Sequence, residues 1–189
     1  MTRGRALGAG AIAALVVPLT WLLFVGLPRW YGVPAKAAAD PRAAQGSTGR
    51  KIKARFFYVS QEGTRLTSVE RDVAYGEGTA EQAKEIVNAQ IAPVSEPLLS
   101  AVPPGTKLRA LFVTETGHAY VDLSREAAAA HPGGSLYELL TVYTIVNALT
   151  ANLPAVSAVQ LLVDGKEVDT LAGHVDLRRP LAKDLSWVQ

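Results

Sequence analysis

Four polar residues at alternate positions come nearest to a catalytic arrangement in this sequence. They occur in the stretch HAYVDLS and are His118, Tyr120, Asp122 and Ser124. A serine, a histidine and a carboxylate form a hydrolase triad when the base reaches the nucleophile at about 3 Å and a third group orients the base. Residues two apart on a strand lie about 6.6–7 Å apart and project in parallel, which favours a solvated strand face. The sequence also lacks a G-x-S-x-G motif, so we predict no catalytic residue and no enzymatic activity.

Residue types that bind metals or phosphate are also poorly arranged for those tasks. The three histidines, His118, His131 and His174, have no H-x-H or H-E-x-x-H spacing. The glycine pair at Gly133 lacks the lysine of a phosphate-binding loop. The chain has no cysteine, which excludes disulfides, thiolate metal sites and a cysteine nucleophile. We therefore expect no metal and no cofactor.

The 189-residue chain has a formal charge of +2 that is distributed unevenly. Residues 1–49 contain five basic residues and one acidic residue, a charge of +4. Residues 50–189 contain 14 basic and 16 acidic residues, a charge of −2. A basic surface for nucleic acid is therefore not expected in the second segment. The content of 49% hydrophobic and 19% charged residues is typical of a globular domain.

Residues 6–27 contain no charged residue and predict a transmembrane signal anchor. A helix of this length spans about 33 Å, enough for a hydrocarbon core of about 30 Å. Two arginines precede it, which favours a short cytoplasmic N-terminus at residues 1–5. Residues 28–49 are rich in Ala, Gly and Pro and predict a flexible linker. The chain would then cross the cell membrane once and hold residues 50–189 outside the cytoplasm.

This apolar segment has two alternative interpretations. Small residues at Ala35, Ala37 and Ala39 fit an A-x-A cleavage site, so the segment could be a signal peptide and the protein secreted. The segment could also be a buried core helix. The apolar run exceeds the about 7–15 residues of a signal peptide, and this length favours the anchor.

After the linker, the sequence periodicity alternates between strands and helices. Two strands are predicted in KARFFYV and LTSVERDVAY, and Arg71 interrupts the apolar face as it would in an edge strand. Thr79 and Gln82 are spaced as a helix cap, and Pro93 ends the helix that follows. Two more strands are predicted, one after the turn at Pro103-Pro104-Gly105 and one in HAYVDLS.

A second helix is predicted within GGSLYELLTVYTIVNALT, where apolar residues recur at helical spacing. Ser135 and Glu138 at its start are spaced as a capping box. Asp164-Gly165 then predicts a two-residue hairpin between apolar runs. This order predicts an α+β fold: a mixed sheet of about six strands with two main helices packed on one face, preceded by the transmembrane helix.

Four stretches, in this order, resemble the GerMN domain, a family named for spore germination proteins. They are AVPPGTKLRAL, AYVDLSRE, ELLTVYTIVNALT and VQLLVDGKEVDTLAGHVDL. The resemblance covers residues 53–181 and is most specific in the second half of the chain. It implies a small extracytoplasmic α+β module in membrane-tethered bacterial envelope proteins, usually without enzymatic activity.

The resemblance places an aspartate in two of these stretches, at Asp122 and Asp176. One interpretation is structural, with a carboxylate at a strand end that accepts nearby backbone N–H groups. The other is contact with a ligand or a partner. Both aspartates are therefore candidate partner-contacting or structural residues.

Together these features predict a non-enzymatic, membrane-anchored interaction or assembly domain of the bacterial envelope, and the resemblance suggests sporulation or germination. Its expected partners are the membrane, through the N-terminal helix, and envelope proteins or further copies of itself. The alternative is a binding module for a small ligand or a cell-wall fragment, which requires polar groups converging on an apolar cleft. A hydrolase is the third alternative.

Overall fold

The computed structural model describes residues 49–189, which lie within one compact unit, Ser47–Gln189. These residues form strands and helices in an alternating order. The strands are β1 (Lys51–Val59), β2 (Leu66–Ala74), β3 (Leu108–Val113), β4 (His118–Leu123), β5 (Ala158–Val163), β6 (Lys166–Glu167) and β7 (Leu181–Ala182). The helices are α3 (Gly78–Ile91), α4 (Glu126–Ala129) and α5 (Ser135–Asn152).

The strands form two separate sheets. β1 and β2 are an antiparallel hairpin, and the second sheet has the order β3-β4-β5-β6, with β7 also paired to β5. In the second sheet β3 is antiparallel to β4, whereas β4 and β5 are parallel. Parallel neighbours need a long crossover connection, and α5 provides it. The five-stranded sheet is therefore mixed.

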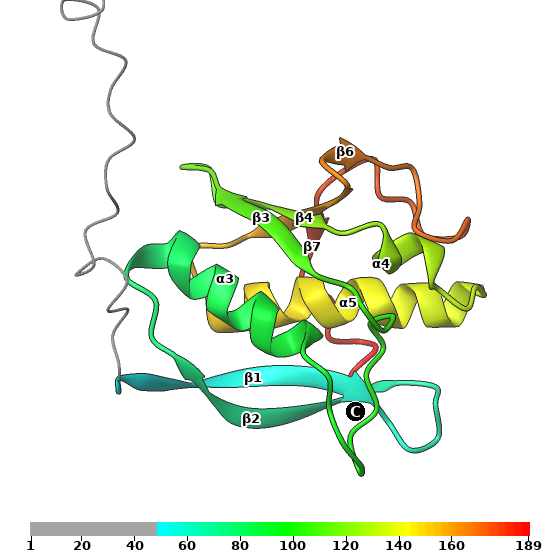
Figure 1. The fold of residues 1–189 in the computed structure, drawn as a ribbon, viewed down its shortest axis with the longest axis horizontal. Helices are drawn as coiled ribbons and strands as arrows, with labels where there is room; N and C mark the ends of the chain where they lie inside the picture. The colour runs from blue at the N-terminus through cyan, green and yellow to red at the C-terminus, as the bar shows by residue number, and fades with distance from the viewer. Residues whose placement is uncertain (1–48) are drawn as a thin grey trace, which may run out of the picture. The chain divides into compact units, whose positions relative to one another are not determined.

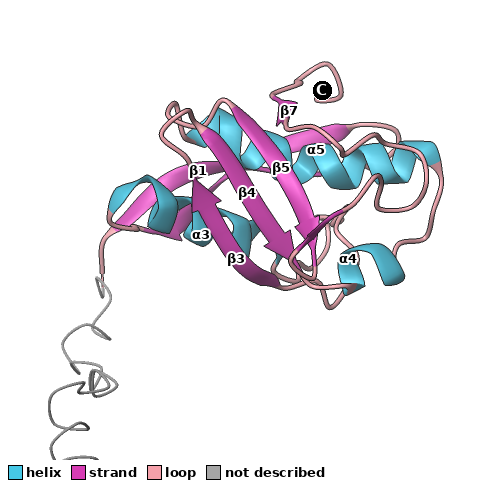
Figure 2. Cartoon of the chain, turned by 90° about the horizontal axis from the view of Figure 1, so that it is seen from above, coloured by secondary structure: helices cyan, strands magenta, loops and turns pink. Residues whose placement is uncertain are grey.

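Helices α3 and α5 lie between the two sheets (Figure 1). α5 contacts β1 on one side and β5 on the other, and α3 contacts both strands of the hairpin as well as β3. From above, β3, β4 and β5 lie side by side across the helices (Figure 2). The predicted α+β class and mixed sheet are confirmed. The arrangement differs from one sheet of about six strands with both helices on one face, because the hairpin covers the opposite side of the helices.

The burial of α5 follows from its place between two sheets. Leu140, Ile145 and Leu149 are fully buried, and so are the polar residues Thr144 and Asn147. A helix packed against one layer keeps a polar stripe toward solvent. α5 instead has protein on several sides, so its buried residues extend well beyond the predicted apolar stripe.

Side-chain amides from the helices close the outer edge of β1. The side-chain amide oxygen of Gln90 accepts a hydrogen bond from the N–H of Phe57 at 2.9 Å, and its amide nitrogen donates to the Phe57 carbonyl at 2.8 Å. The Asn152 amide forms the same pair of bonds with Arg55, at 2.8 and 2.7 Å. An amide side chain thus satisfies the backbone groups that a neighbouring strand would satisfy, and this edge accepts no further strand at these two residues.

The C-terminal segment ties the helix layer to the hairpin. The buried amide of Asn147 bonds the backbone of Asp184 in both directions, at 2.7 and 3.0 Å. Further along, the Leu66 N–H donates to the Trp187 carbonyl at 2.8 Å, and the Gln189 N–H donates to the Leu66 carbonyl at 2.9 Å. The last residues therefore belong to the fold.

The two predicted helix caps are wrong. α3 begins at Gly78, before Thr79, and no side chain caps it. Gln82 instead accepts the Gly76 N–H at 3.0 Å and donates to the Ala74 carbonyl at 3.1 Å, which attaches the helix to the end of β2.

In α5 the residue at the N-cap position is Gly134, with φ of 85°. Ser135 already lies inside the helix, and the Glu138 carboxylate bonds another segment of the chain. Two other local predictions are confirmed. α3 ends at Ile91, just before Pro93, and Asp164-Gly165, both with positive φ, form the turn between β5 and β6.

The predicted transmembrane segment at residues 6–27 lies outside the described residues, as do residues 1–5 and nearly all of the linker at 28–49. Within residues 49–189, no helix combines the length and the apolar character needed to cross a membrane.

Candidate functional site

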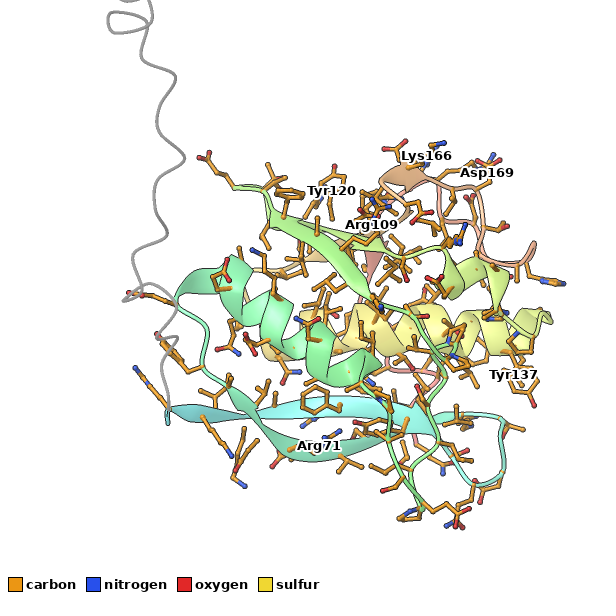
Figure 3. The ribbon with its side chains drawn as sticks, viewed as in Figure 1. Arg71, Arg109, Tyr120, Tyr137, Lys166 and Asp169 are labelled. Atoms are coloured by element: carbon orange, nitrogen blue, oxygen red, sulfur yellow. The ribbon has the colours of Figure 1, made fainter. Side chains whose placement is uncertain are left out.

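The outer face of the five-stranded sheet carries the residues predicted to share one strand face. Its inner face packs on the helices through the buried β4 residues Ala119, Val121 and Leu123. Tyr120 lies on the opposite face, and its neighbour on β3 is Phe112. Phe112 is 66% exposed, the largest exposed fraction among the large hydrophobic residues that the structure describes. In Figure 3, Tyr120 and Arg109 lie on this sheet, far from Arg71 on the hairpin.

β3 is the edge strand of this sheet, and no strand within residues 49–189 pairs with its outer side. The Thr114 N–H donates to the His118 carbonyl at 2.9 Å. Because inward and outward backbone groups alternate along an antiparallel pair, the N–H and C=O groups of Leu111 and Val113 point away from β4. We call this stretch, Leu111 to Val113 with the exposed Phe112 between them, the β3 edge. Such an edge is a template for pairing with another chain.

A bulge ends the regular part of this strand. The register of β3 on β4 shifts between Leu108 and Ala110. Arg109 lies within the shift, and its Nη1 is 2.8 Å from Oδ1 of Asp164 in the β5–β6 turn. The ion pair holds the arginine across the outer face of the sheet, where it is partly exposed.

Asp122 is buried beside this arginine. Its Oδ1 accepts the Gly165 N–H at 2.7 Å, and its Oδ2 is 3.8 Å from Nε of Arg109. The carboxylate therefore fastens the β5–β6 turn to the end of β4. This geometry corresponds to the structural interpretation of Asp122.

The other polar residues of the HAYVDLS stretch have separate partners. The Ser124 hydroxyl oxygen accepts the backbone N–H of Lys107 at 3.0 Å. The backbone N–H of His118 donates to Oγ1 of Thr114 at 3.0 Å. In the described part of the chain no hydrogen bond joins the side chains of His118, Asp122 and Ser124. The structure does not assemble these residues into a triad.

Asp176 lies in the segment before β7, apart from Asp122. Its Oδ1 accepts the backbone N–H of Arg178 at 3.0 Å and the Nε–H of the same residue at 2.9 Å. Its Oδ2 is 2.8 Å from Nη2 of Arg178. These bonds from the Arg178 side chain and backbone hold the pKa of Asp176 far below its usual range. Asp176 is exposed, and its observed partners lie two residues away in the chain.

The histidines lie in different surroundings. Nδ1 of His131 accepts the Gly133 N–H at 2.9 Å, and its Nε2 is 3.1 Å from the Thr141 hydroxyl. Burial lowers the pKa of His131, which favours the neutral ring. His174 lies beside Glu138, with 3.2 Å between Nδ1 and Oε2. Over residues 49–189, no group of three or more His, Asp or Glu side chains is placed to hold a metal ion.

A hollow of about 670 Å³ lies between the C-terminal end of α3 and the start of β3. Its walls come from the segment 91–108 together with Asn88. Leu108, the first residue of β3, contributes to the wall, so the hollow begins where the bulged end of β3 lies.

The comparisons with known proteins relate this arrangement to a family. A family model described as "Germane: Sporulation and spore germination" matches residues 55–169, more than half of the chain. The chain belongs to the Germane family. This result confirms the resemblance predicted from the four sequence stretches. The search of curated proteins found no match.

Solved structures share the fold of this Germane domain. A candidate lipoprotein from Clostridium perfringens is 22% identical, with a TM-score of 0.52 over 71% of this chain and 89% of that chain. The tandem GerMN domains of the sporulation protein GerM from Bacillus subtilis are 16% identical, with a TM-score of 0.52 over 72% of this chain and 46% of that chain. The first GerMN domain of that protein is 16% identical, with a TM-score of 0.52 over 69% and 97%.

One structural residue of the Germane domain was not recognised from the sequence. Glu138 is fully buried, and its carboxylate accepts the N–H groups of Leu171 at 2.8 Å, Ala172 at 2.9 Å and His174 at 2.8 Å. Burial raises the pKa of Glu138, but the backbone N–H donors lower it more, and the net pKa is below the ordinary value. The sequence feature that could have identified Glu138 is a carboxylate in a largely apolar helix. The capping-box spacing from Ser135 gave this carboxylate a local role instead, so its buried position was not predicted.

Arg71 lies on β2, which is an edge strand as predicted. Its guanidinium donates to the Tyr58 hydroxyl and lies 5.5 Å from the centre of the Phe56 ring. Both aromatic residues are buried on β1. The arginine therefore has a packing role in this Germane domain, because it covers the aromatic side chains of the neighbouring strand.

Proposed function

We propose that this Germane domain is a non-enzymatic interaction domain of the bacterial envelope, held outside the cytoplasm by a membrane anchor at residues 6–27. Membership of the Germane family supports a role in sporulation or spore germination. The observation that carries the interaction role is the β3 edge, which presents unpaired backbone groups beside the exposed ring of Phe112. An envelope protein or a second copy of the chain would bind there by adding a strand.

The other long edges of the described sheets are less suited to strand addition. β1 is closed by the amides of Gln90 and Asn152. On β2 the C-terminal segment already bonds the backbone of Leu66. Further along the same strand, the acidic side chains of Glu70 and Asp72 are exposed. Charged residues on an edge discourage pairing. The β3 edge is the one that combines open backbone groups with an apolar side chain.

The first prediction tests the β3 edge in the full chain. Phe112→Ser should weaken association by about 2 kcal/mol, roughly thirtyfold, because an exposed aromatic at the centre of an interface dominates its binding energy. Tyr137→Ser is the matched control, since Tyr137 is also an exposed aromatic, 53% exposed, and lies on α5 away from the sheet edge (Figure 3). The measurements are complementation of a deletion strain and site-specific photocrosslinking from positions 112 and 137.

The expected outcome is loss of complementation and of a discrete crosslinked product at position 112 only, at equal protein levels. Equal complementation by Phe112→Ser and Tyr137→Ser would contradict the role of the β3 edge. The anchor is tested separately: the full chain should remain in the membrane fraction after carbonate extraction, and deletion of residues 6–27 should release it.

The binding of a small ligand is the second candidate function, and the apolar hollow beside α3 favours it. This ligand-binding function is independent of the β3 edge, because Phe112 and Val113 do not line the hollow.

A further inference from the structure

The hollow beside α3 has the size and composition of a ligand site. Its volume of about 670 Å³ falls within the about 300–1,000 Å³ of small-molecule pockets. Most of its wall is apolar, and the contributing side chains include Ile91, Val94, Leu98, Val102 and Leu108. A pocket of this kind takes up the apolar body of a ligand.

Hydrogen bonds fix the segment that forms most of this wall. The Val59 N–H donates to the Leu99 carbonyl at 2.8 Å, which attaches the segment to β1. The Thr141 hydroxyl donates to the Ala101 carbonyl at 2.6 Å, which attaches it to α5. The wall is therefore held in place before a ligand arrives, and a pre-formed site avoids the entropic cost of ordering a loop on binding.

Two polar side chains that line the hollow are exposed and bond no other side chain or backbone group of the described residues. Lys107 is the one ionisable residue among those that line the hollow, and within residues 49–189 its ammonium forms no ion pair. Its backbone is fixed at both ends by Ser124, through the N–H at 3.0 Å and the carbonyl at 2.8 Å. Asn88, on α3, also lines the hollow, and no described residue bonds its side-chain amide. An unpaired cation beside an apolar cavity complements an anion.

We propose that this pocket binds a small amphiphilic carboxylate, with its hydrocarbon body in the hollow and its carboxylate paired with Lys107. Asn88 also lines the hollow, and its side-chain amide is a second donor for a polar group of the ligand. A lysine ammonium is a compact point charge, so it accepts any geometry of a single carboxylate, whether the ligand is a free fatty acid or a shorter branched acid. This inference names the ligand class for the small-ligand function proposed above and rests on that function, but it does not rest on the β3 edge.

The test uses the full chain in membrane vesicles and a decanoic acid that carries a diazirine on its hydrocarbon chain. After irradiation, mass spectrometry should locate the label in the segment 91–108. Lys107→Glu should reduce this labelling by about three- to fivefold, in line with the loss of a partly exposed ion pair, and Lys107→Arg should retain it. Lys53→Glu is the matched control, because Lys53 is exposed on the hairpin and does not line the hollow.

Competition and occlusion complete the test. Unlabelled decanoate should suppress the labelling, whereas decanol and decyltrimethylammonium should not, and a short branched acid that competes equally would extend the ligand class to compact carboxylates. Asn88→Trp places an indole at a residue that lines the hollow, so it should fill part of the volume and abolish labelling. Labelling of 91–108 that persists in both Lys107→Glu and Asn88→Trp would overturn the proposal, and so would label spread evenly over residues 49–189.

Discussion

At the scale of single residues, the Glu138 side chain holds part of the C-terminal half of the domain in place. Its carboxylate is fully buried on α5 and accepts backbone N–H groups from Leu171, Ala172 and His174. Several N–H groups that converge on a carboxylate stabilise its charge without a cation, because each donor points its positive end at the oxygen atoms. One side chain therefore holds the backbone of the loop between β6 and β7 at Leu171, Ala172 and His174.

The second prediction is that Glu138→Ala lowers the free energy of unfolding by about 3 kcal/mol, because the buried N–H of Leu171 and the partly buried N–H groups of Ala172 and His174 lose their acceptor. Chemical unfolding in urea measures the change. Asp176→Ala is the control. Both oxygens of the Asp176 carboxylate also accept hydrogen bonds, but they are exposed to solvent, so this substitution should lower the free energy of unfolding by less than about 1 kcal/mol. Equal losses for the two variants would show that the burial of Glu138 has no energetic role.

The same carboxylate predicts how stability depends on pH. Because the folded pKa of Glu138 lies below its ordinary value of 4.5, its charged form contributes stability above that value. The contribution is lost as the pH falls through the folded pKa. The difference in unfolding free energy between the native chain and Glu138→Gln should therefore be largest near neutral pH and should shrink below about pH 4. A difference that grows toward acid would contradict the lowered pKa.

At this scale the sequence predicted one local turn correctly, but it predicted both helix caps wrongly and missed the long-range contacts. Asp164-Gly165 was predicted as a turn because the positive φ it needs is a property of two adjacent residues. Asp122 and Glu138 instead bond residues 43 and at least 33 positions away. The spacing of neighbours contains no information about those partners, so Glu138 was assigned to a cap only three residues away.

At the scale of elements, the helix amides decide how the hairpin is held. Gln90 and Asn152 project from two different helices and bond the same edge of β1. A polar residue in a helix normally indicates a solvent-facing position. The buried polar positions of α3 and α5 therefore concealed the contact that makes the hairpin a separate layer.

The third prediction follows from the difference in burial between these amides. Gln90→Met keeps the volume of the side chain but leaves the N–H and C=O of Phe57 unsatisfied in a buried site, which should cost about 2–3 kcal/mol. Asn152→Ala should cost about 1 kcal/mol or less, because water can reach the Arg55 backbone. Urea unfolding of both variants checks the order, and an equal or reversed order would contradict the closing role of Gln90.

At the scale of the whole molecule, the fold class was predictable and the layering was not. Alternation and helical spacing depend on which side of an element is buried, and they indicate each element by itself. Whether β1–β2 joins the other strands or covers the far side of the helices depends on contacts between elements distant in sequence. The many buried positions of α5, including Thr144 and Asn147, are the feature that points to protein on both sides.

The last prediction is that this domain unfolds as one cooperative unit. A fragment of residues 50–189 should be soluble and unfold cooperatively, because every described strand and the whole buried core lie within it. Trp187 is the single tryptophan of this fragment, and its carbonyl accepts the Leu66 N–H. Its fluorescence therefore reports whether the C-terminal segment is docked, while far-ultraviolet circular dichroism reports the helices and strands.

Because Asn147 and Leu66 bond this segment to a helix and to the hairpin, its release should coincide with loss of the core. The two signals should show the same midpoint in urea, as a two-state transition requires. Removal of residues 183–189 should lower that midpoint measured by circular dichroism, because the Asn147 amide is then buried without a partner. A fluorescence change that precedes the circular dichroism change would mean that the segment detaches from an intact domain and that the two sheets are held together by the helices alone.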